Sequence, residues 1–173
     1  MKHPQQGFTL IELITVIILL GILSAFAVSR LSSSQSYSTT IIKNQIIASA
    51  RLAQQTAMSR SSVNSASSAG QTQLQITGDT NNWFLNITSG PINYNAQVER
   101  DNEQVHYGTD FSASCSALTA ATATPLILNF DGDGNKAPSS ALRVCIDTPS
   151  ASVASKELCI SPSGYAYEGA CLP

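Results

Sequence analysis

A long apolar run near the N-terminus dominates the pattern of hydrophobic and polar positions. From Phe8 to Val28, 16 of 21 residues are apolar. The exceptions are Thr9, Glu12, Thr15, Gly21 and Ser24. A helix of this length, rising about 1.5 Å per residue, matches a bilayer hydrocarbon core about 30 Å thick. We therefore predict a transmembrane helix over residues 8–28.

Three interpretations compete for this run. Ala25-Phe26-Ala27 has the small-x-small form of a secretory cleavage site, although the run exceeds the about 7 to 15 apolar residues of such a signal. A plain membrane anchor would explain the length but not Glu12. An ionisable group inside a span costs several kcal/mol unless it has a partner, and it indicates function. Because Lys2 precedes the run, the start is predicted to be cytoplasmic and the rest external.

A partner for Glu12 follows if the chain is cut between Gly7 and Phe8. The new amine at Phe8 would then be a positive charge near the membrane boundary. Glu12 of a neighbouring copy would neutralise this amine and align one subunit with the next inside an apolar assembly. The cost of burying Glu12 would thereby set the register between subunits.

Residues 7–13, with the sequence GFTLIEL, followed by Gly21-Ile22-Leu23, resemble the class III signal of type IV pilins and pseudopilins. The resemblance implies that residues 1–7 are a leader that prepilin peptidase removes after Gly7. It also implies that the new N-terminal Phe8 is methylated and that Glu12 matches the family's assembly glutamate.

The same resemblance implies partners and a location. The partners are other pilin subunits, prepilin peptidase and the inner-membrane pilus assembly platform, and no cofactor is implied. Before assembly the chain would be a single-pass inner-membrane protein with its head in the periplasm, and afterwards part of a pilus at the cell surface. The family often has a proline eight residues after Gly21, where this chain has Ser29, so the resemblance does not carry over a helix break there.

A second helical pattern follows the apolar run. Apolar residues at three- and four-residue spacing form one stripe, made of Ile42, Ile46, Ala50, Ala53 and Ala57. We predict that residues 29–60 are an amphipathic helix continuing the first, so that one nearly continuous helix runs from about 8 to 60. The alternative is a separate core helix after a break at the serine-rich residues 32–38.

The pattern changes again after a serine-rich connector at residues 59–70. Residues 61–173 are predicted to form a β-rich head. Seven short segments rich in β-branched or aromatic residues are predicted strands: 73–77, 83–88, 92–98, 104–107, 126–130, 142–146 and 158–160. An antiparallel sheet packed on the long helix gives an α+β fold.

Four cysteines lie in the head, where the predicted location allows disulfides to persist. They are Cys115, Cys145, Cys159 and Cys171, and none has metal-site spacing. A hairpin could place Cys145 opposite Cys159, whereas a bond between Cys159 and Cys171 would close a terminal loop. The spacing does not choose between these pairings.

Charge and catalytic residues exclude several functions. Charged residues make up 12% of the chain and the net charge is −2. Residues 8–60 carry a net charge of +3 and residues 61–173 a net charge of −6, so the head repels phosphate and nucleic-acid binding is not expected. His3 lies in the predicted leader and His106 stands alone in a strand, so we predict that the protein is not an enzyme.

One loop resembles a metal site. Asp131, Asp133 and Asn135 supply oxygen atoms at alternate positions, as the start of an EF-hand loop does. The later positions do not fit, because Lys136 stands where glycine is expected and Leu142 where glutamate is expected. The alternative is a turn between two strands, for which Asp, Gly and Asn are suited.

The narrower resemblance divides the possible functions. Residues 48–60, the late strands and residues 159–164 are similar to minor pilins of the mannose-sensitive haemagglutinin (MSHA) type, which implies a structural subunit supporting surface attachment. They are also similar to minor pseudopilins of type II secretion systems. A hypothesis of another class is an adhesin, a binding module that the fibre displays.

Overall fold

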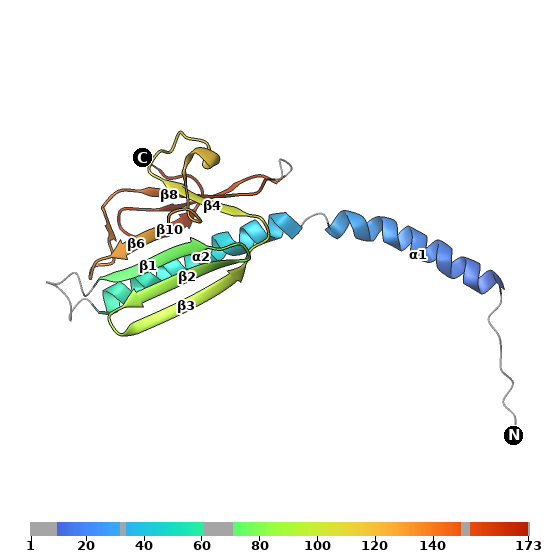
Figure 1. The fold of residues 1–173 in the computed structure, drawn as a ribbon, viewed down its shortest axis with the longest axis horizontal. Helices are drawn as coiled ribbons and strands as arrows, with labels where there is room; N and C mark the ends of the chain where they lie inside the picture. Colours follow the sequence, from blue (N-terminus) through green and yellow to red (C-terminus); the bar gives the residue numbers. More distant parts are fainter. Residues whose placement is uncertain (1–9, 32–33, 61–70, 150–152, 173) are drawn as a thin grey trace, which may run out of the picture. The chain divides into compact units, whose positions relative to one another are not determined.

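The computed structural model describes residues 10–31, 34–60, 71–149 and 153–172 (Figure 1). The chain divides into two compact units, residues 1–34 and residues 35–173. Together the units contain helices and antiparallel sheets, which confirms the predicted α+β class.

Helix α1 (Leu10–Leu31) is the described part of the first unit. It continues through Ser29 and ends two residues later. Among the described residues, the structure has no helix that is both long enough and apolar enough to cross a membrane. The transmembrane assignment of residues 8–28 stays a prediction.

Helix α2 (Ser34–Ser59) opens the second unit. All five residues of the predicted apolar stripe are buried, with exposures of 4% or less. The structure describes two helices within residues 8–60, and residues 32–33 between them lie outside the described residues, so one nearly continuous helix stays a prediction. The serine-rich segment is thus where α2 begins.

In the part of the chain that the structure describes, all seven predicted strands are present, and they belong to two five-stranded antiparallel sheets rather than one. The first sheet has the order β3 (Ile92–Glu99), β2 (Asn82–Ser89), β1 (Thr72–Gly78), β6 (Leu126–Phe130) and β7 (Lys136–Ala137). The second has the order β10 (Ala166–Glu168), β9 (Lys156–Ile160), β8 (Leu142–Asp147), β4 (Gln104–Gly108) and β5 (Thr119–Ala120). Three of these strands, β5, β7 and β10, have only two or three residues and were not predicted.

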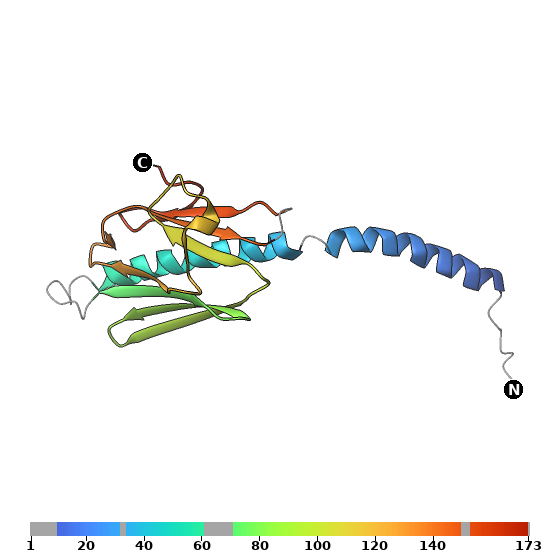
Figure 2. The same cartoon turned by 45° about the horizontal axis from the view of Figure 1, so that its top comes forward.

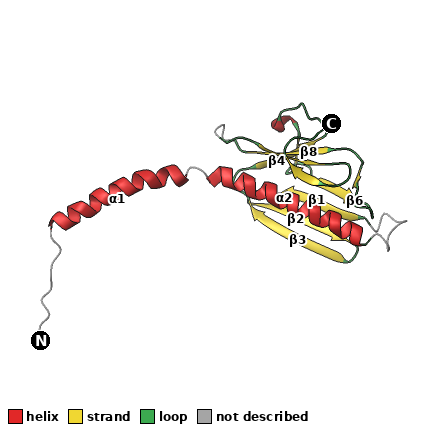
Figure 3. Ribbon diagram, turned by 180° about the vertical axis from the view of Figure 1, so that it is seen from behind, coloured by secondary structure: helices red, strands yellow, loops and turns green. Residues whose placement is uncertain are grey.

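Both sheets lie against α2, which runs between them in Figure 2. One hydrophobic cluster joins the helix stripe to the inner faces of the two sheets. Trp83 and Phe130 are its largest fully buried side chains. Seen from behind, α2 crosses the face formed by β1, β2 and β3 (Figure 3). The opposite face of these three strands is the outer face of the first sheet.

Alternation along the strands separates these two faces, as the period of two requires. On β1 and β2, Leu74, Ile76, Leu85 and Ile87 are buried toward the core. The residues between them are half-buried or exposed, and most are polar. The first sheet therefore has one apolar and one mainly polar face, and only the apolar face contacts α2.

Candidate functional site

Between Leu10 and Leu23, α1 carries large apolar side chains on all of its sides. Its large apolar side chains from Leu10 to Leu23 are between 37% and 77% exposed within the chain. A helix in a soluble core has one apolar stripe, whereas a helix apolar on every side needs apolar surroundings. Glu12 is the one charged residue between Leu10 and Leu23, and it is exposed.

Two polar side chains of α1 bond to the backbone of their own helix. The Thr15 hydroxyl donates to the carbonyl oxygen of Glu12 at 2.9 Å. The Ser24 hydroxyl donates to the carbonyl oxygen of Leu20 at 2.7 Å. These bonds satisfy the hydroxyl groups without water, so neither residue opposes transfer of α1 into apolar surroundings. Gly7 and Phe8, the predicted cleavage and methylation residues, lie outside the described residues.

Helix α2 is fixed to the C-terminal hairpin by two basic side chains. Lys43 is buried, and its Nζ lies 2.5 Å from Oε1 of the exposed Glu168 on β10. Arg51 donates from Nε and Nη2 to the carbonyl oxygen of Ala166, at 3.1 and 2.9 Å. The Arg51 guanidinium also lies 4.9 Å from the ring centroid of Tyr165. The pKa of Glu168 is lowered, first by the hydrogen bond from Lys43 and to a smaller extent by the positive charge of Lys43.

The four cysteines form two disulfides. Cys115, in the short helix η3 (Cys115–Ala117), bonds to Cys145 on β8, with their Cα atoms 5.7 Å apart. Cys159 on β9 bonds to Cys171, with their Cα atoms 5.0 Å apart, and this bond closes the terminal loop. Both bonds lie in the part of the head built on the second sheet.

The alternative pairing of Cys145 with Cys159 does not occur, although their strands do pair. The register of β8 and β9 places Glu157 opposite Cys145, and Arg143 opposite Cys159. The two cysteines are therefore two positions out of register with each other. Arg143 and Glu157 instead form an ion pair, with Nη2 2.5 Å from Oε1.

The loop with the calcium-like pattern is a hydrogen-bonded turn. Asp131 Oδ1 accepts from the backbone nitrogens of Asp133 at 3.0 Å and Asn135 at 2.8 Å. Asn135 directs its amide nitrogen, 3.3 Å away, at Asp131 Oδ2. A calcium site would instead need the side-chain oxygens to converge. Calcium binding by Asp131, Asp133 and Asn135 stays a prediction that these hydrogen bonds do not favour.

This turn meets a second turn from the other sheet. Gln54 on α2 donates from Nε2 to the carbonyl oxygens of Gly134 at 3.1 Å and Ser163 at 2.7 Å. Gly134 and Gly164 both have positive φ, +82° and +79°, and a Cβ at Gly164 would collide with the Gly134 carbonyl oxygen. We call this contact between residues 131–135 and 161–164 the glycine seam. The glycine seam gives a structural role to the calcium-like pattern at residues 131–135 and to the end of the motif at residues 159–164.

His106 and the grouped cysteines have structural surroundings. His106 is 6% exposed, and its Nε2 lies 3.5 Å from Asp147 Oδ1. Over the described ranges, Cys115, Cys145 and Glu157 are the one group of three or more His, Cys, Asp or Glu residues close enough to hold a metal. The disulfide occupies both sulfur atoms of that group, so thiolate ligation there would require its reduction.

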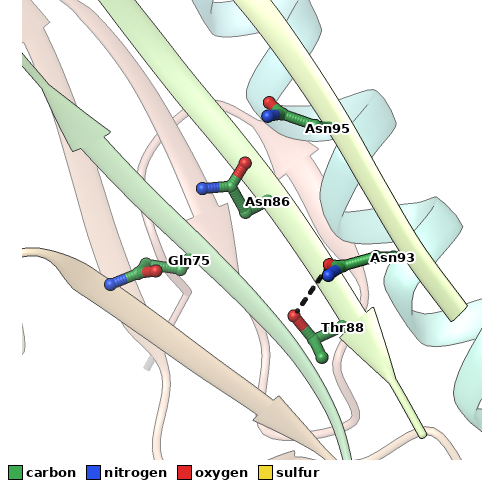
Figure 4. Close-up of a pocket in the computed structure, with 5 residues that line it drawn as sticks. All are labelled: Gln75, Asn86, Thr88, Asn93 and Asn95. Atoms are coloured by element: carbon green, nitrogen blue, oxygen red, sulfur yellow. Dashed lines mark hydrogen bonds between the residues drawn. The ribbon is translucent and has the colours of Figure 1, made fainter. Parts of the chain in front are cut away.

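A polar hollow lies on the outer face of the first sheet (Figure 4). Five uncharged side chains line a volume of about 470 Å³: Gln75, Asn86, Thr88, Asn93 and Asn95. We call it the amide hollow. These residues were not predicted from the sequence, but the alternation of polar and other residues over 92–99 was the available signal, because it places Asn93 and Asn95 on one face.

Comparison with protein families matches residues 2–28 to the prokaryotic N-terminal methylation motif. Neither the curated proteins nor the solved structures gave a match. The motif supports a type IV pilin-like or pseudopilin-like protein that is a substrate for prepilin peptidase and N-methylation. It covers Gly7, Phe8 and Glu12, the three residues for which the sequence predicted processing and assembly roles.

Proposed function

We propose that this chain is a structural subunit of a type IV pilus of MSHA type, a minor pilin that supports surface attachment. The observation that carries the proposal is the set of large apolar side chains on all sides of α1 between Leu10 and Leu23, inside the methylation motif that spans residues 2–28. Burial of each large apolar side chain contributes about 1.5 to 3 kcal/mol. A lipid environment before assembly and neighbouring α1 helices afterwards both supply that burial.

Within the fibre, Glu12 sets the register between subunits. Cleavage after Gly7 gives an amine at Phe8, and Glu12 of the adjacent subunit binds it. A buried carboxylate and ammonium stabilise an assembly only when they meet with good geometry. Subunits in any other register would bury the two charges apart, which costs several kcal/mol.

A minor pseudopilin of a type II secretion system is the alternative. Residues 159–164 resemble both kinds of subunit, and part of this motif forms the glycine seam. A packing role of that kind suits either assembly. Deletion of the coding sequence discriminates the two: loss of surface attachment with normal protein export supports the pilus, and the reverse result supports the pseudopilus.

Processing is tested by mass spectrometry of the assembled material. We expect mature chains that begin at Phe8 and carry one added methyl group on the amine. A chain that retains Met1, or one that begins at Val28 or Ser29, would contradict the proposed processing.

The role of Glu12 is tested with a substitution that keeps its size. We expect Glu12→Gln subunits to be processed and membrane-associated but to enter fibres far less often than the wild type. Glu99→Gln is the matched control, because Glu99 is an exposed carboxylate of the head. Equal incorporation of Glu12→Gln and Glu99→Gln would refute the register mechanism.

A further inference from the structure

We propose that the amide hollow is a binding site for a neutral carbohydrate. This goes beyond the proposed function, because a subunit can assemble without binding any ligand. Each side chain that lines the hollow is a carboxamide or a hydroxyl, and none carries a charge. These groups both donate and accept hydrogen bonds, as the hydroxyl groups of a sugar do.

The strand register arranges the lining side chains as a grid. Gln75, Asn86 and Asn95 lie directly opposite one another on β1, β2 and β3 and form one row of three amides. Thr88 and Asn93 form the next row, two residues along β2 and β3. Neighbouring residues within a row are about 4.8 Å apart, because they lie on adjacent strands, and the two rows are about 7 Å apart along the strands. The grid therefore offers several hydrogen-bonding groups to adjacent hydroxyls of one rigid ring.

The sheet itself holds the grid in place. Thr88 donates a hydrogen bond to Asn93 Oδ1 at 3.4 Å, and this bond joins β2 to β3 (Figure 4). At the far side, Gln73 donates from Nε2 to Asn129 Oδ1 at 3.0 Å, so Gln73 is directed to β6 and does not line the hollow. A site built on paired strands keeps its geometry better than one on a loop.

An unsatisfied atom lies at the centre of the grid. The Asn86 side-chain oxygen is buried and has no hydrogen-bond partner in the described structure. A buried acceptor without a partner costs about 1 to 3 kcal/mol, so a rotation of the Asn86 carboxamide that turns this oxygen toward a sugar hydroxyl is favoured.

Other ligand classes fit less well. An anionic or cationic ligand would find no opposite charge in the lining, and the net charge of −6 on residues 61–173 opposes acidic glycans. An extended peptide binds through a sheet edge and pockets for its side chains, whereas the hollow lies on a sheet face. A second protein copy would need the apolar or aromatic core that protein interfaces have, and the lining contains none.

The test uses the full-length chain in a detergent whose headgroup is not a sugar. The probes are cellotetraose, mannotetraose and chitotetraose, with a heparin-derived tetrasaccharide as the charged comparison and an extended Gly-Ser octapeptide as the peptide comparison. The measurement is the change in the side-chain amide NMR signals of Asn86, Asn93 and Asn95 during titration. We expect saturable shifts of these signals with at least one neutral tetrasaccharide.

Variants connect the shifts to the hollow. Removing two side chains with Asn93→Ala and Asn95→Ala is expected to weaken binding about tenfold or more. Gln97→Ala is the matched control, because Gln97 is an exposed amide on the same strand and does not line the hollow. It should bind within about twofold of the wild type, since it removes no contact to the ligand.

Three results would overturn the proposal. The first is the absence of a saturable shift with all three neutral probes. The second is tighter binding of the heparin tetrasaccharide or of the octapeptide than of any neutral sugar. The third is unchanged affinity in the double variant, with its melting temperature matching that of Gln97→Ala.

Discussion

The two helices of this chain have similar lengths but differ in what covers them. α1 has 22 residues and α2 has 26. The large side chains of α1 from residue 10 to 23 are exposed within the chain, whereas α2 buries one stripe under both sheets. A single stripe specifies a fixed partner in the same molecule. A helix with large apolar side chains on all sides specifies apolar surroundings instead, which in the proposed function are lipid first and other subunits afterwards.

The largest expected difference is between two single variants, one that truncates a buried residue of α2 and one that truncates an exposed residue of α1. Ile46 is fully buried, and Ile46→Ala should lower the free energy of unfolding of the head by about 2 to 5 kcal/mol. Ile18 is 56% exposed, and Ile18→Ala should change it by less than about 0.5 kcal/mol. Denaturant unfolding of the full chain in detergent measures both. Similar losses for the two variants would end the distinction between the helices.

Removal of a disulfide should have the next largest effect, and it should be confined to the head. Loss of the bond between Cys115 and Cys145, which are 30 residues apart, should cost about 3 to 4 kcal/mol. Loss of Cys159–Cys171, with a separation of 12, should cost slightly less. Paired serine variants and thermal melting measure these losses. Hydrogen exchange of α1 should stay unchanged, since neither bond involves that helix, and faster exchange there would show coupling between the units.

Alanine at two glycines sharpens the comparison further. Gly164→Ala should lower the free energy of unfolding of the head by about 1 to 3 kcal/mol, because the site has a positive φ and the new Cβ would meet Gly134. At Gly21 on α1 a Cβ would meet nothing within 4 Å, so Gly21→Ala should stabilise the helix by about 1 kcal/mol. Hydrogen exchange of each region reports the change. A destabilised α1 in Gly21→Ala would contradict this difference.

The smallest expected effect is the pH dependence of the Lys43–Glu168 pair, which joins α2 to β10 and does not involve α1. The pKa of Glu168 is lowered in the folded head, so its stabilising effect is present above the ordinary glutamate pKa and is lost as the pH falls through the lower folded value. Glu168→Gln should therefore lower the melting temperature at neutral pH, and the difference from wild type should shrink in acid. Glu99→Gln is the control. A difference that stays constant from neutral pH into acid would exclude this contribution.

Local patterns predicted the elements better than their arrangement. The stripe from Ile42 to Ala57 and the seven strands follow from the spacing of apolar residues, which short segments of sequence contain. The division into two sheets does not, because it depends on which strands pair across long stretches of chain, as β1 does with β6 and β4 with β8. The disulfide pairing depends on the β8–β9 register, which distant contacts set. The motif at Gly7, Phe8 and Glu12 was readable because its chemistry requires a contiguous sequence, whereas the amide hollow required three strands to be brought together.

The contacts of Lys43 and Arg51 on α2 with β10 also have a consequence for the order in which the head can fold. Arg51 contacts Ala166 across 115 residues, so one side of the helix gains its partner only when nearly the whole chain has been synthesised. Contacts between such distant residues slow folding, and apolar surface that waits for its partner promotes aggregation. A chain that ended before residue 166 would lack β10, and with it the contacts that Ala166 makes with Arg51 and with the hydrophobic cluster. Synthesis of the hairpin formed by β9 and β10 is thus the step that completes the packing of the head.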